Sequence, residues 1–225
     1  MRSCNVFTSY RPYVPLSYKL LNLWGIPCVS LVILCALTWF FPETFRVGEM
    51  AFLGILCLFD VLFDHYAFGG ALTSAAGGME LLKSSPRGLA FYRSVILADT
   101  LLRLLRVFAG LLLLRLLAVV KGISFTDFEE IPLVFEISSA LIYLTVLSLT
   151  FLVLRRIVNT FLLLLFAYIV VALLISAEIF LLPALYTIPV LAILLPGITA
   201  TGFSFLLIRL CVRRRENSYY DTKDV

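Results

Sequence analysis

The sequence predicts an all-helical membrane protein that crosses the bilayer several times. Hydrophobic residues make up 62% of its 225 residues and charged residues only 14%, whereas a soluble domain is nearer to half apolar and a quarter charged. The mean hydropathy is +1.05. The apolar runs are long, rich in leucine and not alternating, so they fit spanning helices of about 20 residues better than the roughly ten-residue alternating strands of a membrane barrel.

Six apolar segments are each long enough to cross a bilayer as a helix. We expect them at Leu20–Phe41, Met50–Phe68, Ala98–Val120, Ile131–Leu154, Ile157–Leu182 and within Ala184–Val212. The second segment is apolar enough to continue towards Leu82. Neither an internal repeat nor a low-complexity linker divides the chain, so one transmembrane domain, 20–212, follows a cytoplasmic interfacial segment, 1–19, and precedes a cytoplasmic basic tail, 213–225.

The distribution of Lys and Arg predicts that both termini lie in the cytoplasm, because cytoplasmic loops are enriched in these residues. With that orientation fifteen of the 18 bases fall on the inner side, and only Arg46 and Lys121 fall in outer loops. We therefore expect a multi-pass protein of the cell membrane, plasma or inner, in contact with lipid. The basic balance does not predict a nucleic-acid partner, since no aromatic and basic recognition module accompanies it.

Aromatic and basic side chains alternate in the N-terminal segment before the first span. The aromatic residues are Tyr10, Tyr13, Tyr18 and Trp24, and the basic residues are Arg11 and Lys19. Amphipathic aromatic side chains favour the headgroup level. Two interpretations are open: an amphipathic segment that lies along the inner leaflet, or an aromatic belt at the entrance to the first span.

Residues 77–93, GGMELLKSSPRGLAFYR, form a polar stretch between the second and third spans. Gly77 and Gly78 favour an end to the helix that leaves the second span. Pro86 disfavours helical geometry at Ser85, and Ser84 or Ser85 caps a new helix whose first position Pro86 takes. That new helix is expected to run into the third span. The stretch therefore predicts a short cytoplasmic helix parallel to the membrane, a shape suited to docking a cytoplasmic partner.

The segment GGMELLKSSPRG resembles the connection between the second and third spans of ABC-2-type transporter permeases. The shared pattern is a small residue, an acid, two leucine-like residues and a Ser-Pro pair, here Gly78, Glu80, Leu81, Leu82, Ser85 and Pro86. Six spans, a cytoplasmic N-terminal segment and a short basic tail also resemble that family.

The resemblance implies that the chain is the permease subunit of an ATP-driven exporter. Permeases of this family form dimers, so a second permease subunit is expected, in a homodimer or a heterodimer. The connecting segment would present a coupling helix to a separate cytoplasmic ABC ATPase, through Glu80, Leu81, Leu82, Lys83, Ser85, Pro86 and Arg87. The chain lacks a GxxxxGK[S/T] phosphate loop. ATP and Mg²⁺ are therefore expected in the partner, and this chain is expected to be no enzyme and to bind no cofactor or metal.

The sequence departs from the family pattern after the fifth span. A polar loop is nearly absent there, and an apolar run, Pro183–Val212, is interrupted by Pro189, Pro196 and Gly197. The run exceeds the roughly 20 residues that a span needs. It is either a pair of short re-entrant helices at the outer face, as the resemblance implies, or one long, kinked sixth helix.

Five ionisable residues lie in or near the second and third spans, where charged side chains are costly. They are Asp60, Asp64, Asp99, Arg103 and Arg106. Counted from the inner ends of two antiparallel spans, Asp64 and Arg106 lie at similar depth, and we expect them to pair. Asp99 and Arg103 are four residues apart, which predicts an intrahelical pair. Asp60 has no evident partner, so it is either protonated or faces a substrate path.

Three further ionisable residues lie nearer the outer ends of the spans. Arg115 either snorkels outward or makes a subunit contact with an outer acid such as Glu136 or Glu178. The two glutamates lie near the outer ends of the fourth and fifth spans, where a substrate-path role is also open.

Two other classes of function stay open. A membrane enzyme needs a catalytic constellation, but the sequence has no HExxH or GxSxG motif and a single histidine, His65. A small multi-span accessory or immunity protein without transport activity needs none of these features. The apolar composition favours an amphipathic or apolar cargo, such as a peptide, a lipid or a drug-like molecule, if the chain is a transporter.

Overall fold

The computed structural model describes residues 14–64, 88–122, 132–154 and 160–217, and within these ranges its regular structure is entirely helical. The first long helical segment consists of α2 (Leu16–Tyr18), the π-helical η1 (Lys19–Gly25) and α3 (Ile26–Phe40). A single 3₁₀ turn, η2 (Pro42–Thr44), connects it to α4 (Phe45–Asp64). The remaining helices are α7 (Gly88–Val120), α8 (Pro132–Leu154), α9 (Thr160–Ser176), the π-helical η4 (Ala177–Leu181), α10 (Leu182–Tyr186) and α11 (Pro189–Asn217).

Four of these helical segments are long and apolar enough to cross a membrane, by length and composition. They are Leu16–Phe40, Leu133–Val153, Leu162–Ala184 and Pro189–Leu210. The structure is therefore compatible with a multi-pass membrane protein, as the sequence predicts. The other two long helices, α4 and α7, coincide with the second and third predicted spans, and they are the helices that carry Asp60, Asp64, Asp99, Arg103 and Arg106.

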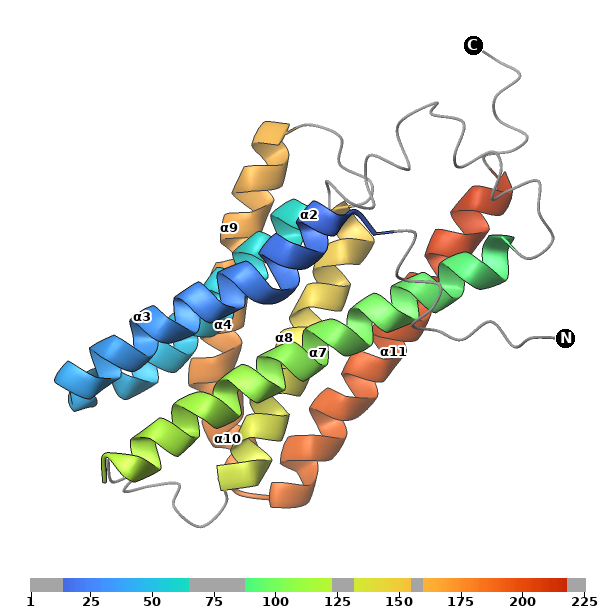
Figure 1. Ribbon diagram of the computed structural model, residues 1–225. Coiled ribbons are helices and arrows are strands. Elements are labelled where there is room, and N and C mark those ends of the chain that lie inside the picture. The colour runs from blue at the N-terminus through green and yellow to red at the C-terminus, as the bar shows by residue number, and fades with distance from the viewer. Residues whose placement is uncertain (1–13, 65–87, 123–131, 155–159, 218–225) are drawn as a thin grey trace, which may run out of the picture.

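Successive long helices run in opposite directions, so each begins at the end of the bundle where the preceding one finishes (Figure 1). The start of α2, the end of α4, the start of α7 and the end of α11 lie towards one end, which we call the terminal end. The connection through η2, the end of α7 and the turn between α10 and α11 lie at the opposite end (Figure 1). α8 packs along α11, α4 packs along α9, and α3 lies beside α4.

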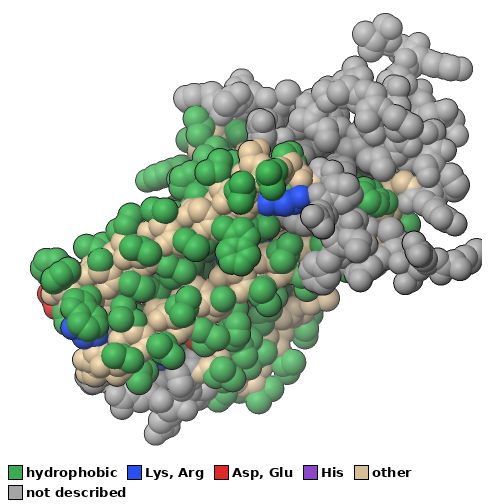
Figure 2. Space-filling model, in the orientation of Figure 1, with side chains coloured by type: hydrophobic (Ala, Val, Ile, Leu, Met, Phe, Trp, Pro, Cys, Tyr) green, Lys and Arg blue, Asp and Glu red, His purple; other side chains and the backbone are tan. Residues whose placement is uncertain are grey.

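The interior joins α4, α7, α8 and α9 through buried apolar side chains such as Phe52, Leu56, Leu111 and Leu147. Gly110 of α7 lies against the Phe52 ring of α4, so that an added Cβ would lie 2.3 Å from the ring. The face formed by α3 and α7 is covered with hydrophobic side chains, and its Lys and Arg side chains lie near its two ends (Figure 2). That distribution is the reverse of a soluble surface and suits contact with lipid.

Three local predictions from the sequence can be compared with these helices. Residues 16–19 begin the first apolar helix, and Tyr18, predicted to be interfacial, is instead buried. Residues 88–93 are the first turns of α7, which runs unbroken into the third predicted span as expected. The apolar run 183–212 begins in the short helix α10, turns at 187–188 and then continues as α11, one unbroken helix with Pro196 inside it; most of the run is therefore one long helix, preceded by a short one.

Candidate functional site

A buried network of charged and polar side chains ties together four helical segments near the terminal end of the bundle. Asp60 and Asp64 come from the last turns of α4, and Asp99, Arg103 and Arg106 come from one face of α7. The N-terminal segment contributes Tyr18 and Asn22, and α8 contributes Tyr143. We call these eight residues the polar network.

Asp60 is the centre of the polar network and is fully buried. The side-chain amide of Asn22 donates to its Oδ1 at 2.9 Å, and Tyr143 and Arg106 both donate to its Oδ2. The guanidinium of Arg103 lies 3.7 Å from Oδ1. Each carboxylate oxygen therefore has a donor, which is what a buried charge requires.

Arg106 also donates a hydrogen bond to a backbone carbonyl of the N-terminal helix that lacks a backbone donor. The N–H of Ile26 donates to the carbonyl of Leu21, five residues earlier, which is the π-helical pattern. The next residue, Pro27, has no N–H, so no backbone donor in sequence reaches the carbonyl of Asn22. Arg106 Nη1 donates to that carbonyl at 2.7 Å. The π-helical turn and the proline thus create an acceptor that one guanidinium satisfies together with Asp60.

Arg103 makes the second half of the polar network. Its Nε lies 2.8 Å from Asp99 Oδ2, and its Nη2 lies 3.4 Å from Asp64 Oδ1. The same Nη2 donates to the Tyr18 hydroxyl at 2.5 Å, and that hydroxyl donates to Asp99 Oδ1 at 3.2 Å. The guanidinium also lies over the ring of Phe151, 4.7 Å from its centre. Arg103 is 1% exposed, so its charge is compensated by protein groups.

The structure confirms one predicted pair and corrects two predictions. The Asp99–Arg103 pair forms as expected. The expected Asp64–Arg106 pair is wrong, because Asp64 pairs with Arg103 and Arg106 pairs with Asp60. Asp60, expected to lack a partner, has several. The physical reason is a shift of one helical turn between α4 and α7, since Asp60 and Asp64 are one turn apart.

The sequence analysis did not identify Tyr18, Asn22 and Tyr143 as members of the polar network. A signal was available for Asn22, because a polar side chain within an apolar helix is expensive unless it is bonded. Pro27, five residues later, was a second signal for the free carbonyl. No comparable sequence signal distinguishes Tyr143 from the other tyrosines.

A second group of buried charges lies towards the opposite end of the bundle. Arg115 Nε is 4.0 Å from Glu136 Oε1, and its guanidinium lies 5.7 Å from the centre of the Phe135 ring. Arg115 therefore contacts an acid of its own chain, whereas the sequence predicted either snorkelling or a contact between subunits. Glu178, in η4, accepts a hydrogen bond of 2.7 Å from Ser139. Glu49, in α4, is also buried and interacts electrostatically with Glu136 and Glu178.

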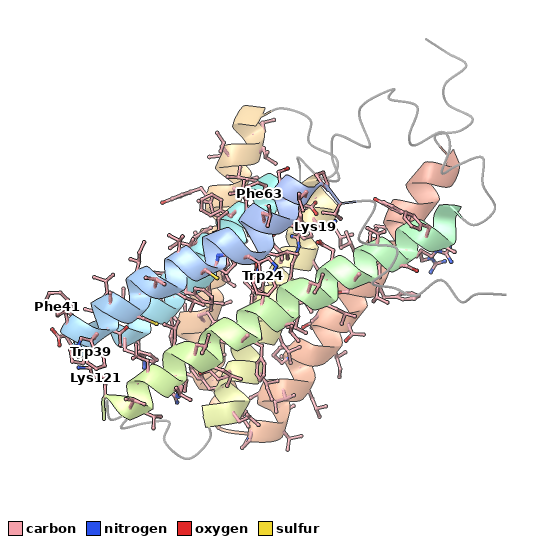
Figure 3. All side chains as sticks on the ribbon, viewed as in Figure 1. Lys19, Trp24, Trp39, Phe41, Phe63 and Lys121 are labelled. Atoms are coloured by element: carbon pink, nitrogen blue, oxygen red, sulfur yellow. The ribbon has the colours of Figure 1, made fainter. Side chains whose placement is uncertain are left out.

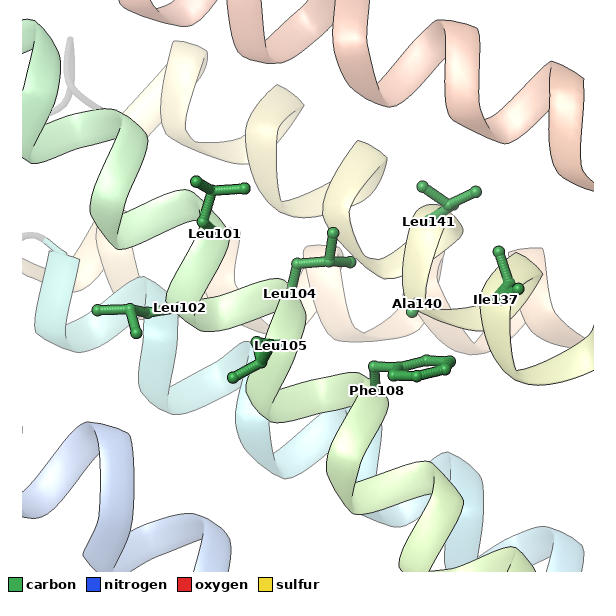
Figure 4. Close-up of a pocket in the computed structure, with 8 residues that line it drawn as sticks. All are labelled: Leu101, Leu102, Leu104, Leu105, Phe108, Ile137, Ala140 and Leu141. Atoms are coloured by element: carbon green, nitrogen blue, oxygen red, sulfur yellow. The ribbon is translucent and has the colours of Figure 1, made fainter. Parts of the chain in front are cut away.

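An apolar groove with a volume of about 430 Å³ opens between α7 and α8 (Figure 4). It is lined by Leu101, Leu102, Leu104, Leu105, Phe108, Ile137, Ala140 and Leu141. The groove adjoins the polar network in sequence, because Arg103 and Arg106 interleave with its leucines on α7 and Tyr143 follows Leu141 on α8. Leu101 and Leu105 are exposed, so the groove is open to the surroundings of the bundle.

The three acids of the polar network share two arginines, and its two tyrosine hydroxyls donate to those acids. Among the residues that the structure describes, no group of three or more His, Cys, Asp or Glu could hold a metal ion. The predicted coupling residues Glu80, Leu81, Leu82, Lys83, Ser85, Pro86 and Arg87 lie outside the described residues.

No protein-family model matches the chain, and neither curated proteins nor solved structures give a significant match. The resemblance to ABC-2-type permeases therefore stays a prediction from the motif.

Proposed function

We propose that the chain is the membrane-spanning permease subunit of an ATP-driven exporter, with six spans, cytoplasmic termini and a separate ATPase subunit. The observation that carries this proposal is the polar network. It ties the last turns of α4 to the first half of α7. These are the two helices on either side of residues 65–87, which include most of the segment that resembles a coupling helix.

The polar network also supports the proposal that α4 and α7 are the second and third spans despite their charges. Each acidic side chain in the network is paired with an arginine across the helix–helix contact or within α7. Paired charges that face the interior of a bundle are the form in which ionisable residues occur inside membranes. Breaking one pair would leave an uncompensated buried charge.

A load applied to the connection between α4 and α7 would pass through these ion pairs to the N-terminal segment and α8. Asn22 and Tyr143 bond to Asp60 from those two helices. Four helical segments would then move together, as ATP-driven export requires. The apolar groove between α7 and α8 supports an amphipathic or apolar cargo, because it presents leucine and phenylalanine side chains.

Purification of the tagged protein from its native membrane, followed by mass spectrometry, tests the proposal. We expect a Walker-type ATPase to co-purify, and we expect it to be lost from Glu80→Ala and Arg87→Ala variants. The matched control is Glu43→Ala, at an exposed position in η2. A stable protein that retains no ATPase would contradict the proposal and favour the accessory or immunity function.

ATPase activity in the reconstituted complex tests the cargo. A Leu104→Trp change fills the groove, and we expect it to abolish stimulation by apolar peptides or lipids while basal ATPase activity persists. Stimulation that is unchanged by this substitution would place the cargo elsewhere.

A further inference from the structure

Three glutamates from three different helical segments lie together towards the end of the bundle opposite the polar network. Glu49 comes from α4, Glu136 from α8 and Glu178 from η4. Their exposed fractions are 5%, 1% and 6%. Glu49 interacts electrostatically with both of the other two. None of the three belongs to the polar network.

Four of the six carboxyl oxygens of these glutamates have no hydrogen-bond donor among the described residues. Glu49 Oε1, Glu178 Oε1 and both oxygens of Glu136 are buried and accept no hydrogen bond. Ser139 uses its hydroxyl on the other oxygen of Glu178. Buried carboxylate oxygens normally accept a hydrogen bond. These four oxygens therefore indicate that a hydrogen-bond donor or a bound ion belongs at this site.

The space beside them is small. A cavity of about 30 Å³ is lined by Glu49, Glu178, Ser139 and Arg46, together with apolar side chains. That volume is about the share of a single water molecule in the liquid. It excludes an organic ligand. A metal ion is also disfavoured, because no set of three acidic, His or Cys side chains in the described part of the chain has metal-binding placement.

The charges of this site do not balance when all groups are ionised. Among the residues that the structure describes, two cations face the three glutamates: Arg115, 4.0 Å from Glu136, and Arg46, which lines the cavity and is exposed. α10 contributes only Leu182 and Pro183 to the cavity wall. Neighbouring buried carboxylates avoid mutual repulsion when one of them holds a proton. The protonated oxygen then becomes a donor to an adjacent carboxylate.

We propose that Glu49, Glu136 and Glu178 form a proton-binding site that holds one proton at neutral pH and releases it when the site opens to an alkaline solution. Binding adds the proton to a carboxylate oxygen, forms one O–H bond and raises the charge of the site by one. Glu178 lies in a π-helical turn, a local geometry that is frequent at functional sites. The proposal does not depend on the transport function above.

Infrared spectroscopy of the full chain in lipid nanodiscs tests the proposal, because a protonated carboxyl group has its own C=O stretching band. At neutral pH we expect such a band, and we expect it to disappear in at least one of the Glu49→Gln, Glu136→Gln and Glu178→Gln variants. Glu43→Gln, at an exposed acid in η2, is the matched control and should leave the band unchanged. A band that survives in all three variants, or no band at neutral pH, would overturn the proposal.

Thermal unfolding against pH gives an independent readout. Loss of the proton leaves an extra negative charge in the cavity wall, so the Tm of the wild type should fall as the pH rises from neutral to alkaline. Glutamine at the position that holds the proton is neutral at every pH, so that variant should show a smaller fall than wild type and Glu43→Gln. An equal fall in the wild type, in Glu43→Gln and in all three of the other glutamine variants would contradict the proposal. A Tm increase in NaCl relative to choline chloride that is lost in Glu178→Gln would instead identify sodium as the occupant and also overturn it.

Discussion

At the scale of single residues, Asp60 shows how a charge is accommodated inside an apolar bundle. Its carboxylate accepts hydrogen bonds from three different helical segments: from Asn22, from Arg106 and from Tyr143. Removing one member of a buried pair costs more than the pair contributes, because the other charge is left without compensation. Asp60 and Arg106 should therefore be strongly coupled in stability.

Asp60→Leu should lower the free energy of unfolding by about 3–5 kcal/mol, the usual cost of an orphaned buried charge. The double variant Asp60→Leu/Arg106→Leu should recover part of that loss, because it removes both charges. Denaturation in mixed micelles measures both effects. Glu43→Leu, at an exposed acid, is the control for loss of a carboxylate. Equal losses in the single and double Asp60 variants would show that the two residues are not coupled.

Gly110 is the second residue whose replacement should be costly. A Cβ there would lie 2.3 Å from the ring of Phe52, which is fully buried and has little room to move. Gly110→Ala should destabilise the fold by about 1–3 kcal/mol, as overpacking does. Gly202→Ala is the matched control, since an added Cβ in α11 meets nothing within 4 Å. Adding Phe52→Leu to Gly110→Ala should restore stability in the same denaturation experiment, and no restoration would argue against this contact.

The two predicted ion pairs show which contacts the spacing of residues in the sequence can predict and which it cannot. Asp99 and Arg103 are neighbours on one helix, so their pairing follows from helical periodicity alone. Asp64 and Arg106 lie on different helices, and their relative depth depends on how α4 and α7 slide past one another. That relative position is set by how the two helices pack, including the contact between Gly110 and the Phe52 ring. Counting residues from the assumed ends of the two helices cannot reveal how the helices are shifted relative to one another.

At the scale of helices, the contact between α8 and α11 depends on a proline. Pro196 lies inside α11 and has no N–H to offer the carbonyl of Ala192, four residues earlier. Ser138, in α8, shares its hydroxyl between that carbonyl, at 2.9 Å, and the carbonyl of Val134 in its own helix, at 2.7 Å. Further along the same contact, Ser148 and Ser204 are 3.2 Å apart. Small polar side chains of this kind hold helices together where the hydrophobic effect is absent.

Ser138→Ala should therefore cost about 1 kcal/mol, because it leaves the Ala192 carbonyl without a donor. In a Pro196→Ala background the same change should cost less, since the backbone N–H of residue 196 then bonds to that carbonyl. A double-mutant cycle from thermal unfolding measures this coupling. Ser176→Ala is the control, because that serine is in α9 and bonds only to its own helix. Additive effects of Ser138→Ala and Pro196→Ala would contradict the proposed exchange of donors.

The π-helical segments are elements that the sequence analysis did not predict. Each carries one buried polar side chain, Asn22 in η1 and Glu178 in η4. A π-helical turn inserts one residue into a helix and so changes which side chains face inward. Apolar periodicity cannot reveal that change, because the neighbouring residues are hydrophobic on every side.

At the scale of the whole molecule, the first helical segment has an aromatic or basic side chain near each end. Lys19 and Trp24 lie towards the terminal end, and Trp39, Phe41 and Lys121 lie together at the other (Figure 3). The ammonium group of Lys121 is 3.3 Å from the centre of the Trp39 ring. Lys19 and Trp39 are separated by about 30 Å at a rise of about 1.5 Å per residue, which matches the hydrocarbon thickness of a bilayer.

Fluorescence quenching by lipids labelled at known depths tests this placement, because the chain has two tryptophans and both are exposed. In the Trp24→Phe variant the remaining Trp39 should be quenched most by labels near the headgroups. In the Trp39→Phe variant Trp24 should be quenched by labels about 8 Å deeper, since it lies five residues inside Lys19. Poor quenching of both tryptophans at every label depth would contradict the membrane placement of this helix.

Most of the helical pattern was predictable from sequence, because long apolar segments between polar breaks define helices. Each predicted span overlaps a long helical segment in the described part of the chain, and four of the segments are long and apolar enough to cross a membrane. The polar network was predictable only in part. Its charged residues were identified from their cost in an apolar segment, whereas the neutral donors Tyr18, Asn22 and Tyr143 depend on which helices are neighbours.

The length of α7 has a mechanical consequence. Its 33 residues extend over about 50 Å, well beyond the roughly 30 Å of a hydrocarbon layer. Figure 1 shows this helix inclined to α8. A push along the axis of an inclined helix has a component perpendicular to the neighbouring helix, and it displaces the far end of the inclined helix sideways. A force applied to α7 at Gly88 would therefore displace the helices of the bundle sideways relative to one another, instead of moving them along the membrane normal.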